Sequence, residues 1–187
     1  MFKLLKIISK AGEATAKYPF APYPVSPGFR GKPEFTGEQC IACAACVVAC
    51  PPNALRMHTN TAEGTRTWSL NLGRCIFCGR CEEVCPTKAI ALSPEFELAV
   101  GSKADLMQEA TFTLSVCTCC EKPFAPTKEI DYAIALMVQS GLPESQIATT
   151  RAQFATCPEC KRKQALASVE PAQHMDAQRR AQQGAAA

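Results

Sequence analysis

The sequence predicts an α+β protein with an internally duplicated, cysteine-rich core and a second cysteine module after it. Three observations predict this architecture. A four-cysteine pattern occurs twice at a fixed offset, two further Cys-x-x-Cys pairs lie near the C-terminus, and the N-terminal residues have helical periodicity. The expected segments are an amphipathic helix with a proline-rich docking arm (1–36), the duplicated core (37–100), a four-cysteine metal-binding module with an inserted helix (101–170) and a flexible tail (171–187).

The first segment begins with an amphipathic helix. Its apolar and charged side chains fall on separate stripes. The apolar stripe contains Leu4, Leu5, Ile8 and Ala11, and the charged stripe contains Lys3, Lys6, Lys10, Glu13 and Lys17. We expect this helix to touch a membrane surface or a membrane-embedded partner, and the alternative is a helix packed on its own domain. Five prolines between residues 18 and 36 predict an extended arm that stays out of any core and crosses a neighbouring subunit.

The second segment contains the repeat. Each cysteine of the first run recurs 35 residues later, and a proline follows the fourth cysteine each time, at Pro51 and Pro86. Such runs hold [4Fe–4S] clusters in bacterial ferredoxins, where the fourth cysteine of each run ligates the other cluster. We therefore expect two [4Fe–4S] clusters, and the alternative is a pair of zinc sites. The predicted ligands are Cys40, Cys43, Cys46 and Cys85 for cluster 1, and Cys75, Cys78, Cys81 and Cys50 for cluster 2.

The third segment contains a second candidate metal site. Cys117 and Cys120 form one Cys-x-x-Cys pair, and Cys157 and Cys160 form another, which together suit a structural Zn²⁺ ion. Apolar residues at helical spacing predict one helix over about residues 127–140 between the pairs. A third iron–sulfur cluster and unligated thiols are the alternatives. We interpret Cys119, the remaining thiol, as a bystander.

Composition limits the function. The 187-residue chain has 13 cysteines, and no apolar run approaches the roughly 18 residues that span a membrane. We therefore expect a reducing compartment, where many cysteines indicate metal sites rather than disulfides. Residues 1–36 carry a net charge of +4, residues 37–150 carry −4 and residues 151–187 carry +3, without the basic stripe of a nucleic-acid-binding protein. With no catalytic triad, phosphate loop or dinucleotide motif in the sequence, we expect no catalytic activity of its own.

The cysteine runs and their flanks resemble a known family. Four segments and the 24-residue insert between the runs resemble the ferredoxin-type subunit of complex I. The segments are Phe29-Arg30-Gly31, residues 37–43 (GEQCIAC), residues 75–86 (CIFCGRCEEVCP) and residues 96–99 (FELA). Residues 117–124, 128–136 and 157–161 depart from complex I. They are similar to the iron–sulfur subunit of formate hydrogenlyase and its hydrogenase-4 counterpart, and with them the resemblance covers nearly the whole chain.

This resemblance implies an electron-transfer subunit of a membrane-bound group 4 [NiFe] hydrogenase. Such a subunit relays electrons from formate or another donor module toward a nickel–iron site on a different subunit. The implied partners are the hydrogenase large and small subunits, a ferredoxin-like donor subunit and a membrane subunit. The implied location is peripheral, on the cytoplasmic side of the inner membrane. A freely diffusing two-cluster ferredoxin and the equivalent complex I subunit are the alternatives.

Overall fold

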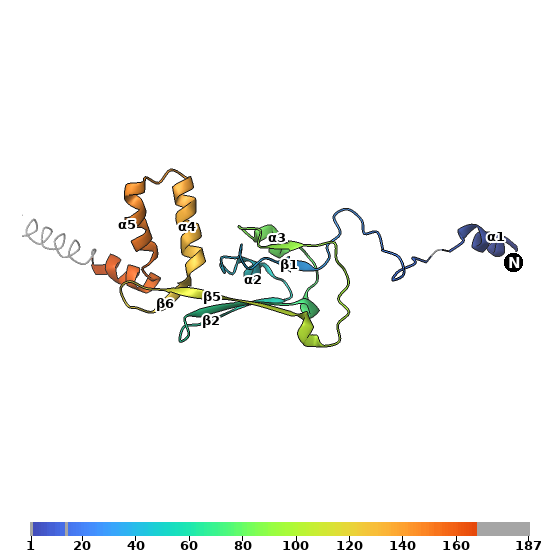
Figure 1. The fold of residues 1–187 in the computed structure, drawn as a ribbon, viewed down its shortest axis with the longest axis horizontal. Helices are drawn as coiled ribbons and strands as arrows, with labels where there is room; N and C mark the ends of the chain where they lie inside the picture. Colours follow the sequence, from blue (N-terminus) through green and yellow to red (C-terminus); the bar gives the residue numbers. More distant parts are fainter. Residues whose placement is uncertain (1, 14, 168–187) are drawn as a thin grey trace, which may run out of the picture.

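The computed structural model describes residues 2–13 and 15–167, so the expected flexible tail lies outside the described residues. Helices and strands alternate along the chain, as predicted for an α+β protein (Figure 1). The elements are α1 (Phe2–Ala11), β1 (Pro33–Phe35), α2 (Ala45–Ala49), β2 (Leu55–Asn60), β3 (Thr65–Asn71), the 3₁₀ turn η1 (Leu72–Arg74), α3 (Arg80–Val84), β4 (Ile90–Leu92), the 3₁₀ turn η2 (Lys103–Leu106), β5 (Met107–Val116), β6 (Pro123–Pro126), α4 (Thr127–Gln139) and α5 (Glu144–Phe154).

The strands form two antiparallel sheets. Strand β1 pairs with β4, while a larger sheet has the order β2-β3-β5-β6. Strands β2 and β3 form a hairpin, in whose turn the Asn60 side-chain oxygen accepts the amides of Ala62 and Glu63. The whole of β3 pairs with the first part of β5, and the end of β5 pairs with β6. The larger sheet therefore runs across the expected boundary near residue 100 and joins the duplicated core to the C-terminal cysteines.

The main hydrophobic core lies between the larger sheet and the cysteine runs. Trp68 of β3 is 1% exposed and stacks on Phe35 of β1, with ring centroids 3.8 Å apart and an angle of 12° between the rings. Leu55, Leu70 and Ile90 are also buried here. Most cysteines of the two runs pack against these side chains. The core that excludes water from the sheet thus also covers one side of the cysteine loops.

The arm is not wholly outside the core, which corrects the prediction for residues 18–36. Pro33 is fully buried at the start of β1, where the sheet does not need the N–H group that proline lacks. Further back, Tyr18 and Phe29 pack their rings on Phe96, with centroids 5.6 and 6.2 Å apart. The arm therefore folds onto its own chain, and β1 belongs to the core domain.

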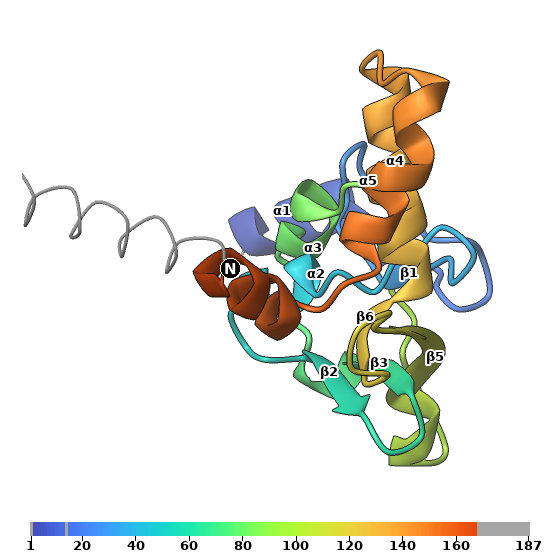
Figure 2. The ribbon, with the colours of Figure 1, turned by 90° about the vertical axis from the view of Figure 1, so that its left-hand side faces the viewer.

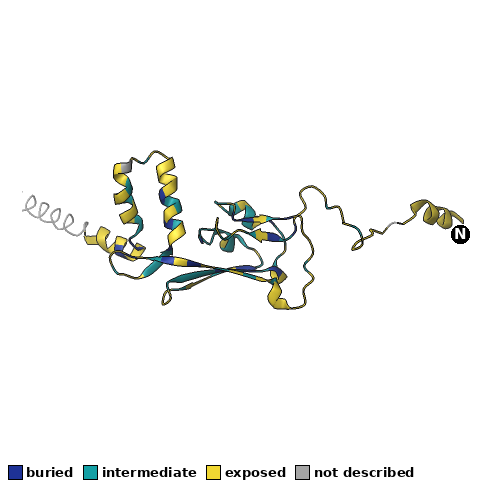
Figure 3. Cartoon of the chain, viewed as in Figure 1, coloured by how far each residue is buried: buried dark blue, intermediate teal, exposed yellow. Residues whose placement is uncertain are grey.

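Helix α1 is confirmed, and it lies at one end of the molecule (Figures 1 and 3). None of its described residues is buried, and Phe2, Leu4, Leu5 and Ile7 are each at least 60% exposed. Helix α1 thus does not pack on its own domain. No helix in the described part of the chain is long and apolar enough to cross a membrane.

The insert between the C-terminal cysteine pairs contains two helices, not one. Helix α4 matches the predicted helix at 127–140, but α5 follows it and completes a helical hairpin (Figures 1 and 2). An ion pair between Asp131 and Arg151, 3.0 Å long, joins the two helices. Sequence reasoning missed α5 because its apolar residues do not gather on one face of the helix. Pro143 lies directly before α5.

Candidate functional site

The two cysteine runs have the same backbone conformation at the 35-residue offset. Helix α3 lies 35 positions after α2, and each begins one residue before the third cysteine of its run. Left-handed residues also recur. Ala42 and Phe77 have φ values of +56° and +55°, and Ala44 and Gly79 have φ values of +64° and +81°. Successive left-handed and right-handed residues turn several amides toward one concave side, which suits binding of an anionic group.

The first cysteine loop and the end of the second run line one cavity. Cys85 is the contribution of the second run, and it lies directly before Pro86. Trp68 and Phe35 form part of the wall, so the hydrophobic core closes this side. The four cysteines that line the cavity are Cys40, Cys43, Cys46 and Cys85.

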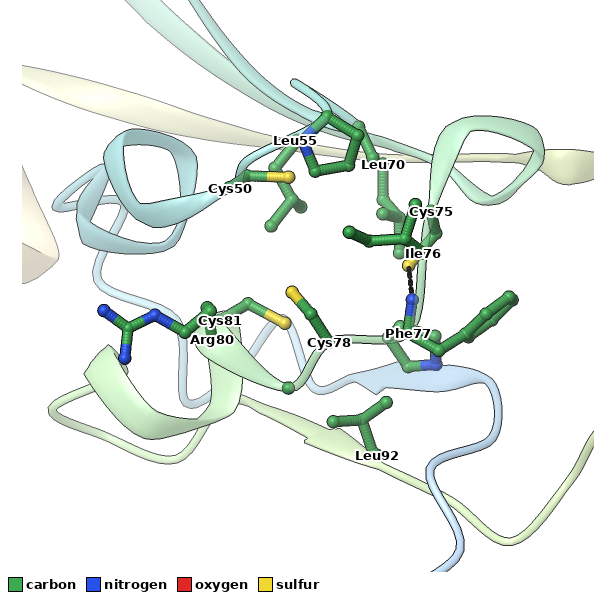
Figure 4. Close-up of a pocket in the computed structure, with 14 residues that line it drawn as sticks. Cys50, Leu55, Leu70, Cys75, Ile76, Phe77, Cys78, Arg80, Cys81 and Leu92 are labelled. Atoms are coloured by element: carbon green, nitrogen blue, oxygen red, sulfur yellow. Dashed lines mark hydrogen bonds between the residues drawn. The ribbon is translucent and has the colours of Figure 1, made fainter.

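A second cavity repeats this arrangement with the roles of the two runs exchanged. Cys50, from the end of the first run, faces the second loop across it (Figure 4). Leu55, Leu70 and Leu92 supply apolar walls. The four cysteines that line this cavity are Cys50, Cys75, Cys78 and Cys81. Each cavity therefore combines three cysteines of one run with the last cysteine of the other run.

Backbone amides donate to cysteine sulfurs in both cavities. The Ala42 amide donates to Cys40 Sγ and the Phe77 amide donates to Cys75 Sγ, each at 3.4 Å. The Ala89 amide donates to Cys85 Sγ at 3.2 Å. Hydrogen bonds of this kind stabilise negative charge on sulfur and are one of the factors that set the reduction potential of a bound iron–sulfur cluster.

Burial makes four of these thiols hard to ionise without a cation. It raises the pKa of Cys81 to about 11, and it also raises the pKa values of Cys40, Cys46 and Cys75. At Cys85 burial acts in the same direction, but hydrogen bonds from Thr87 and the following backbone outweigh it and lower the pKa. A bound metal reverses this balance, because its positive charge deprotonates a coordinating thiol. Four soft sulfur donors in a largely apolar cavity fit an iron–sulfur cluster.

Basic side chains bind the carbonyls of both loops. Arg30 donates to the Cys78 carbonyl at 2.8 Å, and Arg66 donates to the Ala42 carbonyl at 3.2 Å. Lys128, from the first turn of α4, donates to the carbonyls of Gly37 and Glu38 at 3.0 Å each. Sequence reasoning did not identify these roles. Arg30 is next to a glycine in a segment that resembles complex I, but no local signal marks Arg66 or Lys128, because their partners are distant in sequence.

The C-terminal cysteines form a separate group. The Sγ atoms of Cys117, Cys120, Cys157 and Cys160 all lie within 4.8 Å of one another, and three of the four residues are buried. The Cys157 amide donates to Cys117 Sγ at 3.2 Å, which links the two Cys-x-x-Cys pairs. That hydrogen bond is the main reason that the pKa of Cys117 falls to about 6. The structure therefore brings together the four residues that the sequence predicted for this site.

The donor set of this group fits a single ion with tetrahedral coordination. A Zn–S bond of about 2.3 Å implies sulfurs about 3.8 Å apart at the corners of a tetrahedron. The Cys120 and Cys157 sulfurs are 3.8 Å apart. Cys119 is exposed and lies outside the group, although its amide donates to Cys117 Sγ at 3.4 Å.

Comparison with known proteins assigns the duplicated core. Residues 39–89 match the 4Fe-4S dicluster domain, a range that includes every cysteine of the two runs. The chain is 53% identical to formate hydrogenlyase subunit 6 of Escherichia coli (strain K12) over 178 residues, which is 94% of this chain and 98% of that protein.

More distant similarities cover about half of the chain. NADH-quinone oxidoreductase subunit I from Psychrobacter arcticus and from Pseudomonas fluorescens is in each case 41% identical over 104 residues, which is 51% of this chain and 57% of each relative. Among solved structures, a chain of the membrane-bound sulfane sulfur reductase, an archaeal respiratory membrane complex, is 28% identical with a TM-score of 0.44, over 56% of each chain.

Proposed function

The chain belongs to the family of formate hydrogenlyase subunit 6, an iron–sulfur electron-transfer family, and we propose that it relays single electrons through two [4Fe–4S] clusters inside a membrane-bound hydrogenase complex. The observation that carries this proposal is the pair of equivalent cavities, each lined by four cysteines. A [4Fe–4S] cluster takes up and releases one electron at a time, over a wide range of potentials that its surroundings set.

We propose the same ligands that the spacing predicts. Cys40, Cys43, Cys46 and Cys85 hold cluster 1, and Cys75, Cys78, Cys81 and Cys50 hold cluster 2. The exchange of the last cysteine between the cavities supports this crossed assignment. The matching left-handed residues and amide–sulfur hydrogen bonds support a similar role for both loops.

The rest of the chain supplies the environment of the clusters. Apolar walls from Trp68, Leu55 and Leu70 exclude water, and the amides of Ala42 and Phe77 stabilise charge on sulfur. Because the two runs exchange their last cysteines, each cluster fixes the position of the other run. The two clusters and the two runs therefore form one rigid unit.

We propose that the C-terminal group binds one structural Zn²⁺ ion through Cys117, Cys120, Cys157 and Cys160. The compact spacing of the sulfurs supports a single ion. A four-iron cube would hold its cysteine ligands farther apart, outside its corners, so a third cluster is less compatible with this geometry. Amide hydrogen bonds to the Cys117 and Cys157 sulfurs, which stabilise thiolates, are evidence against inert thiols.

The proposed partners are those of the family. We infer that the chain contacts the hydrogenase large and small subunits, a ferredoxin-like donor subunit and a membrane subunit, on the cytoplasmic side of the inner membrane. The exposed apolar face of α1 supports a peripheral membrane contact and argues against a freely diffusing ferredoxin. The C-terminal cysteine module and the near-complete match to formate hydrogenlyase subunit 6 favour the hydrogenase complex over complex I.

Metal analysis of anaerobically purified full-length protein tests this function. We expect about eight iron and eight acid-labile sulfide per chain, the content of two [4Fe–4S] clusters, together with about one zinc. Electron paramagnetic resonance of the reduced protein should show two interacting clusters. Iron far below this amount would rule out the relay. In cells, the chain should co-purify with a nickel-containing subunit from the membrane fraction.

A further inference from the structure

A lysine from the C-terminal module lies at the first cysteine loop. Lys128 is the second residue of α4, and its ammonium group donates to the carbonyls of Gly37 and Glu38, which lie 91 and 90 residues earlier in the chain. These carbonyls are three and two residues before Cys40. The same ammonium group is 5.6 Å from the centre of the Phe112 ring, in the core below. Three contacts therefore hold one positive charge at the entry to the loop.

The neighbouring residue of α4 makes a second link to the same loop. A carboxylate oxygen of Glu129 is 3.9 Å from the guanidinium of Arg66, which also donates to the Ala42 carbonyl inside the loop. Arg66 is largely buried, with 19% of its side chain exposed. The positive charge of Arg66 is thus offset by Glu129. Among the described residues Lys128 forms no such ion pair, so its charge is not cancelled in the same way.

Lys128 distinguishes the surroundings of the two loops. Arg66 binds a carbonyl of the first loop and Arg30 binds a carbonyl of the second. The second run has a lysine contact of its own, because Lys88, just after that run, donates to the Glu82 carbonyl at 3.2 Å. Lys128 differs because it comes from outside the repeat, and its two backbone contacts lie at the approach to the first loop. Its position is set by β5 and β6, which connect the sheet to the C-terminal cysteines and lead into α4.

We infer that Lys128 raises the reduction potential of the cluster in the first cysteine loop relative to the cluster in the second. This inference rests on the proposed function. Reduction adds one negative charge to a cluster, and a nearby positive charge stabilises the reduced form. Because the effect falls with distance and with solvent screening, it is larger for the first cluster than for the second. Lys128 acts through its charge and its contacts with the loop backbone, and it does not touch the proposed cluster ligands.

A charge series at position 128 in full-length protein tests the inference. The variants Lys128→Arg, Lys128→Met and Lys128→Glu keep, remove and reverse the charge, and redox titration followed by electron paramagnetic resonance measures each cluster separately. Cys43→Ser identifies the signal of the first cluster. We expect Lys128→Met to lower the equilibrium constant for one-electron reduction of that cluster about three- to tenfold. This corresponds to a reduction potential lower by about 30–60 mV. Lys128→Glu should shift it further, and Lys128→Arg should leave it near the original value.

The matched control is Lys10→Met, which makes the same charge change on α1, far from both cavities (Figure 1). It should move neither potential by a comparable amount. Equal shifts of both clusters in Lys128→Met, or no shift, would overturn the inference. Loss of the first cluster in Lys128→Met and Lys128→Glu, with retention in Lys128→Arg, would also overturn it, because Lys128 would then hold the loop together. Absence of clusters from the unmodified chain would instead refute the proposed function.

Discussion

At the scale of single residues, each cavity depends on one cysteine from the other run. Cys85 lines the cavity of the first loop and Cys50 lines that of the second. With the proposed ligands, this exchange would make each cluster depend on the loop of the other run. It also means that the position of a cysteine along the chain does not by itself say which cluster it affects.

We therefore expect Cys85→Ser to damage the first cluster, which the Cys40 loop surrounds, and Cys50→Ser to damage the second. Serine keeps the size of the side chain but offers a hard oxygen in place of a soft sulfur. Electron paramagnetic resonance and iron content of each variant measure the outcome. Damage confined to the cluster of the mutated run would contradict the crossed assignment.

The C-terminal group allows a second test at this scale. Cys119→Ser should leave the zinc content at about one per chain, because this exposed thiol lies outside the four-sulfur group. Cys120→Ser, one residue away, should remove most of the zinc. Elemental analysis of both purified variants provides the comparison. If zinc is lost from Cys119→Ser and retained in Cys120→Ser, the proposed ligand set is wrong.

At the scale of elements, the residues before β1 and the segment after β4 come together at one close backbone approach. The Gly31 amide donates to the Ser93 carbonyl at 2.9 Å, and a side chain at Gly31 would collide with the carbonyls of Ser93 and Glu95. Neither carbonyl is the end of a flexible side chain. The pairing of β1 with β4 therefore requires glycine at this position.

Gly31→Ala should lower the free energy of unfolding by about 1–3 kcal/mol, the usual cost of forcing extra volume into a packed site. Gly101→Ala is a suitable control, because no atom lies within 4 Å of the added methyl group and the backbone there is not left-handed. Denaturant unfolding of both variants measures the difference. Equal stability of the two would show that β1 is not held by this contact.

At the scale of the whole molecule, the duplicated core and the C-terminal cysteine group share one sheet. Strand β5 pairs with β3 below the duplicated core and ends directly before Cys117. The core has its own buried cluster of side chains, while the C-terminal sulfurs pack mainly with one another and with Phe124. This separation predicts that the two centres can be lost independently.

Cys160→Ser should therefore release the zinc ion while about eight iron atoms per chain remain. Without the ion, the two cysteine pairs keep only hydrogen-bond links such as that from the Cys157 amide to Cys117 Sγ, so we expect the α4–α5 hairpin to move more freely. Hydrogen exchange should accelerate in α4 and α5 and stay slow in β3. Loss of both zinc and iron in this variant would mean that the core folds only together with the C-terminal module.

The exposed helix α1 provides the other prediction at this scale. Replacing Leu5 and Ile8 by glutamate removes two exposed side chains from its apolar face. Burial of each side chain in a membrane contributes about 1.5–3 kcal/mol, so we expect each replacement to lower the membrane affinity about tenfold or more. Co-sedimentation of the full-length chain with vesicles of phosphatidylethanolamine and phosphatidylglycerol measures that affinity. Glu13→Gln, in the segment just after α1, is the control. Unchanged binding of the double variant would exclude α1 as the membrane contact.

The sequence by itself determined which cysteines gather into groups. Cysteine spacing within a run is local, since residues three apart on a tight loop or short helix lie close whatever the rest of the chain does, and the repeat indicated two equivalent loops. The apolar periodicity of 127–140 and of the N-terminus likewise predicted α4 and α1. A local pattern can only predict local structure, and α5 was missed because its sequence lacks one.

Only the tertiary structure decided what surrounds those loops. Pro33 looked like part of an arm that avoids the core, yet it is buried in β1, because its partner strand lies more than fifty residues further along the chain. Arg30, Arg66 and Lys128 reach loop carbonyls 48, 24 and about 90 positions away. Contacts over such separations depend on the path of the whole chain, which no short spacing encodes.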